Sequence, residues 1–250
     1  MNKNIYLSVV VPSYNEMSNL KRGVLDEVYQ YLSKQKYNWE VLLVDDGSTD
    51  ETFNFLQKFA KKHKYFYPIL EPHRGKAGTV IEGMLKAKGD LVLFTDTDQA
   101  TPIDQIEKLT QMIDAGSDIA IGSRTGRKGA PLIRKIMAMG FVVLRTVILR
   151  MPYKDTQCGF KIFKKTASNK IFSKMKELHK MESIDGYTVT AGFDLEVLYL
   201  ARKMGFRVSE VDVFWEEKGV KGRVNPIKDS WIGLRGLIQV RINAILGRYK

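Results

Sequence analysis

The chain has 250 residues, an ordinary hydrophobic content of 44% and a formal net charge of +12. This length favours one large α/β domain over two small ones, and this composition excludes a disordered or fibrous protein. The single cysteine, Cys158, excludes an internal disulfide framework and suits a reducing compartment. The N-terminus has no long apolar segment followed by a cleavage site, so we expect no signal peptide.

The charge is divided unevenly along the chain. Residues 1–123 contain 14 Lys and Arg against 17 Asp and Glu, a net of −3, whereas residues 124–250 contain 26 against 11, a net of +15. The second half is therefore expected to face an anionic partner. A nucleic acid and an anionic membrane surface both qualify, and a lysine-rich surface in solution fits the charge equally well. No transmembrane helix is predicted, because the longest apolar run of residues 132–151 covers only residues 136–144.

Apolar runs alternate with amphipathic segments through the first half. The runs predict buried strands over residues 5–11, 39–44, 65–70, 90–95 and 117–122. The segments between them predict helices over residues 19–33, 49–62, 75–88 and 102–115, the second of which is expected to be capped by Ser48 or Thr49. Apolar strands separated by helices are typical of a parallel, doubly wound sheet flanked by helices.

The second half is less regular. It predicts amphipathic helices over residues 131–150 and 230–248, a further helix over 193–204, strands over 158–163 and 207–214, and a Gly- and Lys-rich loop over 216–226. We find no internal repeat and no low-complexity tract. The expected fold class is therefore α/β, with amphipathic helices in the C-terminal half.

Acidic clusters follow three of the predicted strands, namely Asn15-Glu16, Asp45-Asp46 and Asp96-Thr97-Asp98. Ligands of an open parallel sheet bind outside the carboxyl ends of its strands. A single acid there is more often a helix cap, but acids gathered at one edge repel one another unless a cation or another ligand lies among them. Asp96 and Asp98, separated by one residue, can reach one hard cation such as Mg²⁺ or Mn²⁺, with phosphate oxygens completing its shell.

These motifs resemble those of the family-2 glycosyltransferases, which have the GT-A fold. The matching segments are Val9-Val10-Val11-Pro12-Ser13-Tyr14-Asn15-Glu16, Val44-Asp45-Asp46-Gly47-Ser48-Thr49-Asp50, Asp96-Thr97-Asp98 and Gly122-Ser123-Arg124. The longest match, Asp155-Thr156-Gln157-Cys158-Gly159-Phe160-Lys161-Ile162-Phe163, is similar to the polyprenyl-phosphate branch. Within that branch the chain resembles dolichyl-phosphate glucose synthases most and mannose synthases next, from about residue 5 to residue 245.

The resemblance implies a metal-dependent, inverting transferase that moves a hexose from a nucleotide-sugar onto a polyprenyl phosphate. Glucose from UDP-glucose is favoured, because Gly192-Phe193-Asp194 matches the glucose synthases where mannose synthases often read G-Y-K. GDP-mannose as the donor and a soluble acceptor stay as alternatives. The resemblance also implies one domain over residues 1–250, with a nucleotide-sugar-binding half (1–123) and an acceptor- and membrane-facing half (124–250). We expect it at the cytoplasmic face of a membrane, peripherally attached.

The same resemblance implies roles for individual residues. Those implied to bind the base and ribose are Pro12, Tyr14, Glu16, Val44 and Asp46, with Asp45 either assisting or only shaping the turn. Those implied to bind the diphosphate and its Mg²⁺ or Mn²⁺ are Asp96, Thr97 and Asp98, of which Asp96 and Asp98 are the metal ligands. Lys76 and Arg223 are implied to contact the donor, although Lys76 fits a plain surface lysine equally well. The implied catalytic set is Asp98, Arg124, Arg134 and Asp194, in which the arginines lie near the acceptor phosphate.

Asp194 is expected to orient the acceptor, bind a basic neighbour or begin a helix. A strong base is not required, because a phosphate acceptor is already ionised near neutral pH. The chain departs from the glucose synthases at Gln99, where they usually have glycine, and unlike the eukaryotic members it is expected to have no N-terminal membrane anchor.

Two amphipathic helices offer membrane contact instead. In the first, Met137, Phe141, Leu144 and Ile148 can enter the lipid boundary, with Arg145 and Arg150 at the headgroups. The last carries Trp231, Leu234, Ile238, Ile242 and Ile245 and is expected rather to pack onto the sheet. A nucleic-acid partner is not expected, because zinc spacing, an RNP-like signature and a helix-turn-helix pattern are all missing from the sequence. A nicotinamide enzyme is disfavoured because no G-x-G-x-x-G follows the first strand.

Overall fold

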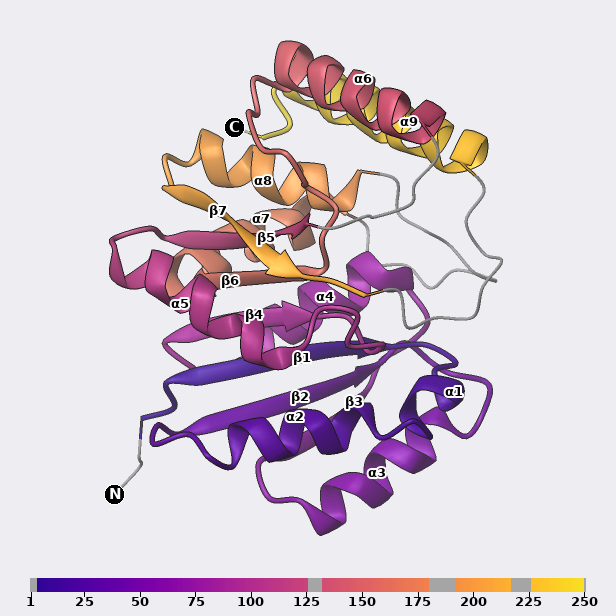
Figure 1. Ribbon diagram of the computed structural model, residues 1–250, viewed down its shortest axis with the longest axis vertical. Coiled ribbons are helices and arrows are strands. Elements are labelled where there is room, and N and C mark those ends of the chain that lie inside the picture. The colour runs from indigo at the N-terminus through magenta and orange to yellow at the C-terminus, as the bar shows by residue number, and fades with distance from the viewer. Residues whose placement is uncertain (1–3, 126–131, 180–191, 217–225, 250) are drawn as a thin grey trace.

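A seven-stranded sheet in the order β3-β2-β1-β4-β6-β5-β7 forms the centre of the molecule (Figure 1). The structure is a computed structural model that describes residues 4–125, 132–179, 192–216 and 226–249. Its strands are β1 (Leu7–Ser13), β2 (Trp39–Asp45), β3 (Phe66–Leu70), β4 (Leu91–Thr95), β5 (Ile119–Thr125), β6 (Phe160–Lys164) and β7 (Val208–Phe214). Strand β6 runs antiparallel to both of its neighbours, β4 and β5, and the other described pairs are parallel.

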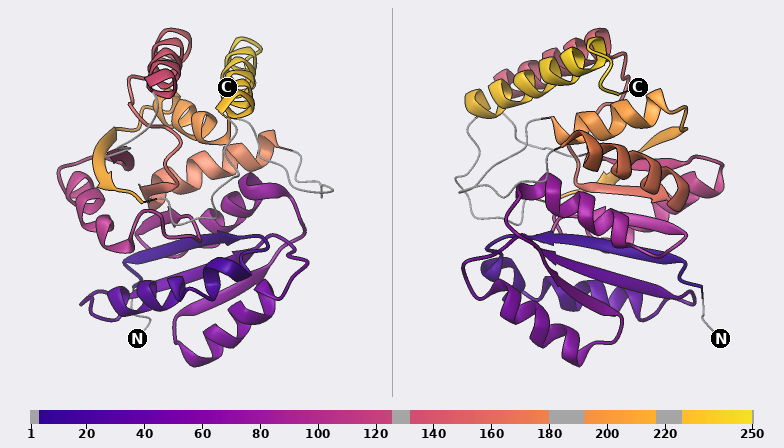
Figure 2. Two further views of the ribbon diagram at one scale, coloured as in Figure 1. Left: turned by 45° about the vertical axis from the view of Figure 1, so that its right-hand side comes forward. Right: turned by 180° about the vertical axis from the view of Figure 1, so that it is seen from behind.

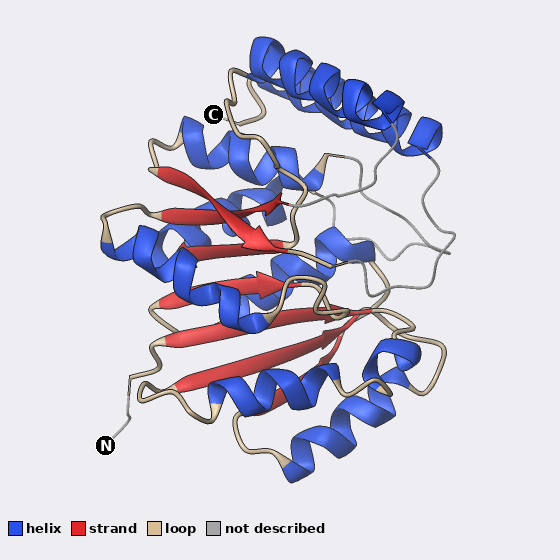
Figure 3. Cartoon of the chain, viewed as in Figure 1, coloured by secondary structure: helices blue, strands red, loops and turns tan. Residues whose placement is uncertain are grey.

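Helices cover both faces of this sheet (Figures 2 and 3). They are α1 (Met17–Leu20), α2 (Val24–Leu32), α3 (Thr52–Lys62), α4 (Gly75–Lys86), the 3₁₀ turn η1 (Ile103–Gln105), α5 (Ile106–Asp114), α6 (Leu132–Leu149), α7 (Lys165–Leu178), α8 (Phe193–Lys203) and α9 (Pro226–Ile245). The predicted mostly parallel sheet flanked by helices is confirmed. The division of the chain at residue 123 stays a prediction.

Alternation along β1 shows how the two layers of helices are held. Val10 packs in a core with α4, α7 and α8, whereas Val9 and Val11 pack in a second core with α1, α2, α3 and α5. Successive side chains of a strand point to opposite faces, so a strand that is apolar throughout must be covered on both sides. All three valines are at most 1% exposed, which accounts for the uninterrupted apolar run seen in the sequence.

Two of the predicted helices differ in detail from the structure, and one helix of the structure was not predicted. The helix expected over residues 19–33 is divided into α1 and α2 at Gly23, whose φ of +82° is a left-handed conformation that ends the first helix. The helix expected from residue 49 begins at Thr52, and the predicted caps are wrong, because Ser48 donates its hydroxyl to Asp45 while Asp50 accepts from the Thr52 N–H. Helix α7 was not predicted.

Helices α6 and α9 pack against each other, and α9 also packs on α8 (Figure 1). The apolar face of α6 differs from the prediction, because Phe141 and Ile148 are partly buried against the core and Arg145 is 2% exposed rather than at the surface. The outward apolar residues of the two helices are Met139, Val143, Leu144, Val147, Trp231, Ile238, Ile242 and Ile245. Helix α9 is thus packed on one side and exposed on the other. Within the described ranges, no helix has both the length and the apolar content needed to span a bilayer.

Candidate active site

The three acidic clusters lie together because β2, β1 and β4 are neighbours whose carboxyl ends point to one edge of the sheet (Figure 1). The register sets Ser13 of β1 opposite Asp45 of β2. A direct hydrogen-bond bridge joins β1 to the loop after β4, because the Thr97 hydroxyl donates to the Pro12 carbonyl at 2.5 Å and lies 3.1 Å from the Ser13 hydroxyl. The expectation that parallel strands gather these acids at one edge is confirmed.

Asp45 shapes the turn after β2. Its side chain is fully buried and accepts hydrogen bonds from the N–H and the hydroxyl of Ser48, at 2.8 and 2.7 Å. Burial raises the pKa of this carboxyl, and the two Ser48 hydrogen bonds oppose that shift. With both oxygens used inside the turn, the geometry favours the second of the two roles expected for Asp45.

Asp46 ties the end of β2 to the start of α4. Its carboxylate oxygens lie 2.8 Å from His73 Nδ1 and accept a hydrogen bond from the Arg74 N–H at 2.8 Å. His73 in turn stacks on the half-buried ring of Tyr14, with centroids 4.2 Å apart and planes 12° apart. Asp46, His73 and Tyr14 therefore form one connected group beside the turn that was predicted to bind the nucleotide.

Two other residues assigned to the nucleotide have different surroundings. The Val44 side chain is fully buried in the core, so it presents no side-chain surface at the edge of the sheet. The Glu16 carboxylate accepts a hydrogen bond from the Asn19 side chain, and the backbone N–H of Glu16 donates to the Thr52 hydroxyl at 2.8 Å. Glu16 thereby joins the loop after β1 to the start of α3.

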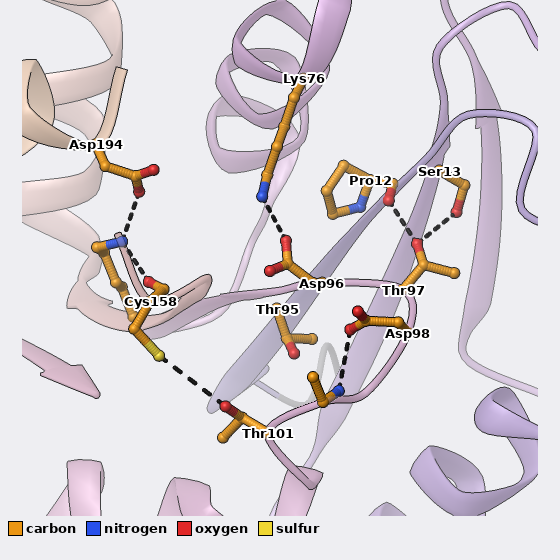
Figure 4. A network of polar contacts seen from close by, with 12 residues as sticks. Pro12, Ser13, Lys76, Thr95, Asp96, Thr97, Asp98, Thr101, Cys158 and Asp194 are labelled. Carbon is orange, nitrogen blue, oxygen red and sulfur yellow. Dashed lines mark hydrogen bonds and ion pairs between the residues drawn. The ribbon is translucent and has the colours of Figure 1, made fainter. Parts of the chain in front are cut away.

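Charged residues of both signs surround the Asp96–Asp98 pair (Figure 4). The Lys76 ammonium, at the start of α4, lies 2.6 Å from Asp96 Oδ1. Across from it, the Asp194 carboxylate at the start of α8 lies 2.6 Å from the ammonium of Lys161, which is fully buried in β6 and also donates to the Cys158 carbonyl. Burial lowers the pKa of Lys76, but the charges of Asp96 and Asp194 outweigh it and raise that pKa above its usual value.

The antiparallel register of β6 brings the motif at residues 155–163 against Asp96. Thr95 of β4 pairs with Phe160 of β6, so the next residues along the ladder are Asp96 and Gly159. A Cβ placed on Gly159 would lie 1.9 Å from Asp96 Oδ2. Only glycine leaves room for this carboxylate, which is why the motif has glycine at this position.

Arg124 lies at the end of β5 and is held by Asp155. Its Nε and Nη2 donate to the two carboxylate oxygens of Asp155 at 2.5 and 2.9 Å, and its guanidinium faces the ring of Trp215 at 5.8 Å. Burial alone would raise the pKa of Asp155, but the hydrogen bonds and charge of Arg124 hold it below its usual value. This fork holds the guanidinium in one orientation, and its remaining N–H donors suit recognition of a phosphate.

A pocket joins Arg124 to the Asp96–Asp98 pair. Its lining residues are Thr95, Asp96, Asp98, Ala100, Thr101, Arg124, Gln157, Gly159 and Trp215. Arg134 lies in the first turn of α6, where the structure describes the backbone but not the side chain, and Arg223 lies outside the described residues. The structure therefore brings Asp96, Asp98, Lys76, Arg124 and Asp194 into one region.

The two carboxylates fit a hard divalent cation. Mg²⁺ and Mn²⁺ take oxygen ligands, and Mg²⁺ is commonly held by one or two carboxylates together with substrate phosphates. Burial and the charge of Asp96 raise the pKa of the Asp98 carboxyl. A bound cation would relieve the repulsion between the two carboxylates. Over the described ranges no group of three or more His, Cys, Asp or Glu side chains forms a metal cage, so phosphate oxygens and water would have to complete the shell.

Several residues of this site were given no individual role from the sequence. They are His73 and Trp215, together with Asp155, Gly159 and Lys161, which were noted only as members of the matching segment. The sequence contained a signal for Lys161, because a lysine flanked by apolar residues in a predicted buried strand requires a partner. It contained no signal for the stacking of His73 on Tyr14, because 59 positions separate these residues in the chain.

Comparison with known proteins agrees with this geometry. The profile of glycosyl transferase family 2 matches residues 8–172. The dolichyl-phosphate beta-glucosyltransferases of Dictyostelium discoideum and Saccharomyces cerevisiae are 31% and 32% identical to the chain, over 99% of its length and 77% and 78% of theirs.

Solved structures of low sequence identity share the fold. Mannosyl-3-phosphoglycerate synthase from Rubrobacter xylanophilus has a TM-score of 0.67 at 18% identity, covering 98% of this chain and 75% of that one. Glucosyl-3-phosphoglycerate synthase from Mycobacterium tuberculosis, solved with Mn²⁺, UDP and glucosyl-3-phosphoglycerate, has a TM-score of 0.58 at 15% identity, covering 98% of this chain and 80% of that one. The chain therefore belongs to glycosyl transferase family 2, within the group of the dolichyl-phosphate beta-glucosyltransferases, and is a hexosyltransferase with the GT-A fold.

Proposed function

We propose that the enzyme transfers glucose from UDP-glucose to a polyprenyl phosphate of the dolichyl type, with inversion at the sugar C1. The observation that carries this proposal is the likeness to dolichyl-phosphate beta-glucosyltransferases over 99% of the chain. The pocket between the Asp96–Asp98 pair and Arg124 supports the proposal. The two carboxylates at one end can bind a metal ion, and the guanidinium at the other end can bind a phosphate. GDP-mannose is the second donor to be tested.

The charges around the pocket suit a reaction between two anions. The acceptor phosphate and the donor diphosphate repel each other, so cations must screen both and stabilise the departing diphosphate. We assign Asp96 and Asp98 to a divalent cation on the diphosphate and Arg124 to the acceptor phosphate. The cation would supply charge neutralisation of the leaving group. The Mycobacterium tuberculosis neighbour, solved with Mn²⁺ and UDP, supports a divalent cation in an enzyme of this fold.

Asp194 is better suited to positioning than to proton transfer. Its carboxylate lies 2.6 Å from the ammonium of the buried Lys161 and is therefore already engaged as the counter-charge of that residue. The acceptor phosphate has a second pKa of about 6 and needs little help to react as a nucleophile near neutral pH. We therefore assign Asp194 to holding Lys161 and the start of α8 beside the site.

The outward face of α6 and α9 is proposed to rest on an anionic membrane surface, at the cytoplasmic face. Its apolar residues, defined above, include Val147 and Trp231, which are 71% and 69% exposed. The exposed Arg235, Arg241 and Arg248 lie on α9 or directly after it. Apolar residues flanked by arginines fit the boundary between acyl chains and anionic headgroups, where a lipid acceptor presents its phosphate.

A transfer assay tests the reaction. The protein is incubated with Mn²⁺ or Mg²⁺, dolichyl phosphate in detergent, and radiolabelled UDP-glucose or GDP-mannose in separate tubes, and the organic phase is counted. We expect labelled lipid from UDP-glucose, its loss in Asp98→Ala, and its retention in Asp104→Ala, a change of an exposed aspartate outside the pocket. Product only from GDP-mannose would overturn the proposed donor, and hydrolysis without lipid product would overturn the proposed acceptor.

A vesicle flotation assay tests the membrane surface. Ile242→Glu is expected to reduce flotation with phosphatidylserine vesicles, whereas Leu70→Glu, at an exposed apolar position on the edge strand β3, should leave it unchanged. Equal flotation of both variants and the wild type would contradict this surface.

A further inference from the structure

Lys76 forms an ion pair with the carboxylate of Asp96, which is also a ligand of the proposed cation. Its ammonium lies 2.6 Å from Asp96 Oδ1, in the position of a counter-cation (Figure 4). The other oxygen, Oδ2, faces Gly159 so closely that no side chain fits between them. A cation shared by Asp96 and Asp98 must therefore compete with Lys76 for Asp96.

The contact is accessible enough to exchange. The side chains of Lys76 and Asp96 are 45% and 40% exposed, unlike the fully buried Lys161 nearby. Exposed ion pairs of this kind contribute little to stability, so a divalent cation with a stronger preference for carboxylate oxygen can displace the lysine. The long flexible stem of Lys76 lets its charge move without any change in the backbone.

Negative charge is available wherever the displaced ammonium can reach. The charges of Asp194 and Asp98 act on Lys76 together with that of Asp96, so its ammonium stays within the field of the site. Lys161 is held by its ion pair with Asp194, so Lys76 is the mobile one of these two lysines. The donor diphosphate would add the strongest local anion at the N-terminus of α4, where Lys76 is the second residue of the helix.

We propose that Lys76 is the resident counter-cation of Asp96 in the empty enzyme and that it exchanges with the divalent cation as the donor binds, moving its charge from Asp96 to the diphosphate. This inference rests on the proposed donor site. It makes Lys76 a positioning residue that couples the two ligands: the lysine opposes the cation when no nucleotide is present and assists the nucleotide once the cation has entered.

Binding measurements on Lys76→Met test the exchange without any turnover. Free Mn²⁺ is followed by its electron paramagnetic resonance signal during titration of nucleotide-free protein, and UDP affinity is measured by calorimetry in saturating Mn²⁺. We expect Lys76→Met to bind Mn²⁺ about fivefold more tightly than the wild type, which corresponds to about 1 kcal/mol for an exposed pair. We expect it to bind UDP about tenfold more weakly, because a charge-assisted contact is lost.

The control is Lys86→Met, a second lysine of α4 that is 44% exposed and paired with Glu71. It should change neither affinity, and Asp96→Asn should remove Mn²⁺ binding from the wild type and from Lys76→Met alike. A folded Lys76→Met that binds Mn²⁺ no more tightly than the wild type would overturn the exchange, even in an enzyme that transfers glucose. The two opposite changes in a protein without transferase activity would support the exchange and overturn the proposed function. No Mn²⁺ binding by any variant, even with UDP present, would overturn both.

Discussion

Replacing Gly159 by alanine would place a methyl group against the Asp96 carboxylate, with its Cβ 1.9 Å from Oδ2 and 2.4 Å from Cγ. Ordinary contact begins near 3.4 Å, and the difference between 3.4 and 1.9 Å means that the carboxylate must retreat by about 1.5 Å. Asp96 can make this movement by rotating its side chain, because it is 40% exposed. The fold should therefore survive while the proposed cation ligand is displaced.

A misplacement of about 1 Å in a catalytic group can reduce the rate by about 100-fold. We therefore expect the Gly159→Ala variant to lose about 100-fold in kcat/KM for glucose transfer, which corresponds to about 2.7 kcal/mol in the activation barrier. The free energy of unfolding should change by less than about 1 kcal/mol, as for other substitutions that move one partly exposed side chain. Initial rates with labelled UDP-glucose and urea unfolding followed by circular dichroism measure the two quantities.

Gly140→Ala provides the matched control, because a Cβ at Gly140 on α6 would have no neighbour within 4 Å. Alanine is the better helix former there, so both activity and stability should be kept. Full activity in Gly159→Ala would refute the placement of Asp96 at the reacting centre. A loss of folding at residue 159 that matched the loss of activity would refute the argument that only the carboxylate moves.

Three further predictions concern charged pairs. Asp194→Asn should destabilise the fold by about 3 kcal/mol in urea unfolding, because it leaves the fully buried Lys161 ammonium without its counter-charge. Lys161→Met should cost less, and a larger loss of stability in Lys161→Met than in Asp194→Asn would contradict this account of the pair. Asp155→Asn should raise KM for the polyprenyl phosphate about tenfold with little change in KM for UDP-glucose, since it releases the proposed acceptor arginine; an unchanged acceptor KM would argue against Arg124 in that role. The hydrogen bond to Glu196 raises the pKa of His179 despite burial. The contribution of this pair to the free energy of unfolding should therefore be full below the unfolded pKa of about 6.5 and be lost as pH rises through the folded pKa. His179→Gln should flatten this pH-dependent loss of stability, and an unchanged profile of stability against pH would refute the assignment.

Strand-end chemistry is the part of this site that can be predicted from sequence. Acids that directly follow the apolar strands of a parallel sheet lie at one edge of that sheet, and the clusters at Asp46 and Asp96 follow that rule. What the sequence could not provide is the position of β6. A five-residue strand such as β6 has the same sequence pattern whether it runs parallel or antiparallel, so the contact between Gly159 and Asp96 could not be predicted from the residues alone.

Pairings across the fold were similarly inaccessible. Lys161 and Asp194 are 33 residues apart, and nothing in either segment names the other as its partner. Arg145 was expected at the membrane surface because of its charge, but it is buried and donates to the Thr156 hydroxyl at 3.2 Å. Helix α7, in contrast, could have been predicted, because Ala167, Ile171 and Met175 recur at helical spacing.

The place of β6 in the sheet has a consequence for how the protein is synthesised. Strand β6 follows β5 in the chain but lies between β4 and β5, so both neighbours keep an open edge until residue 164 has left the ribosome. A nascent chain that ends near residue 125 would carry the nucleotide turn and both aspartates, yet lack the strand that seals β4. Open apolar edges of this kind favour association between chains. Fragments of the nucleotide-binding half alone should therefore aggregate, and the donor site should form only as a late step of folding.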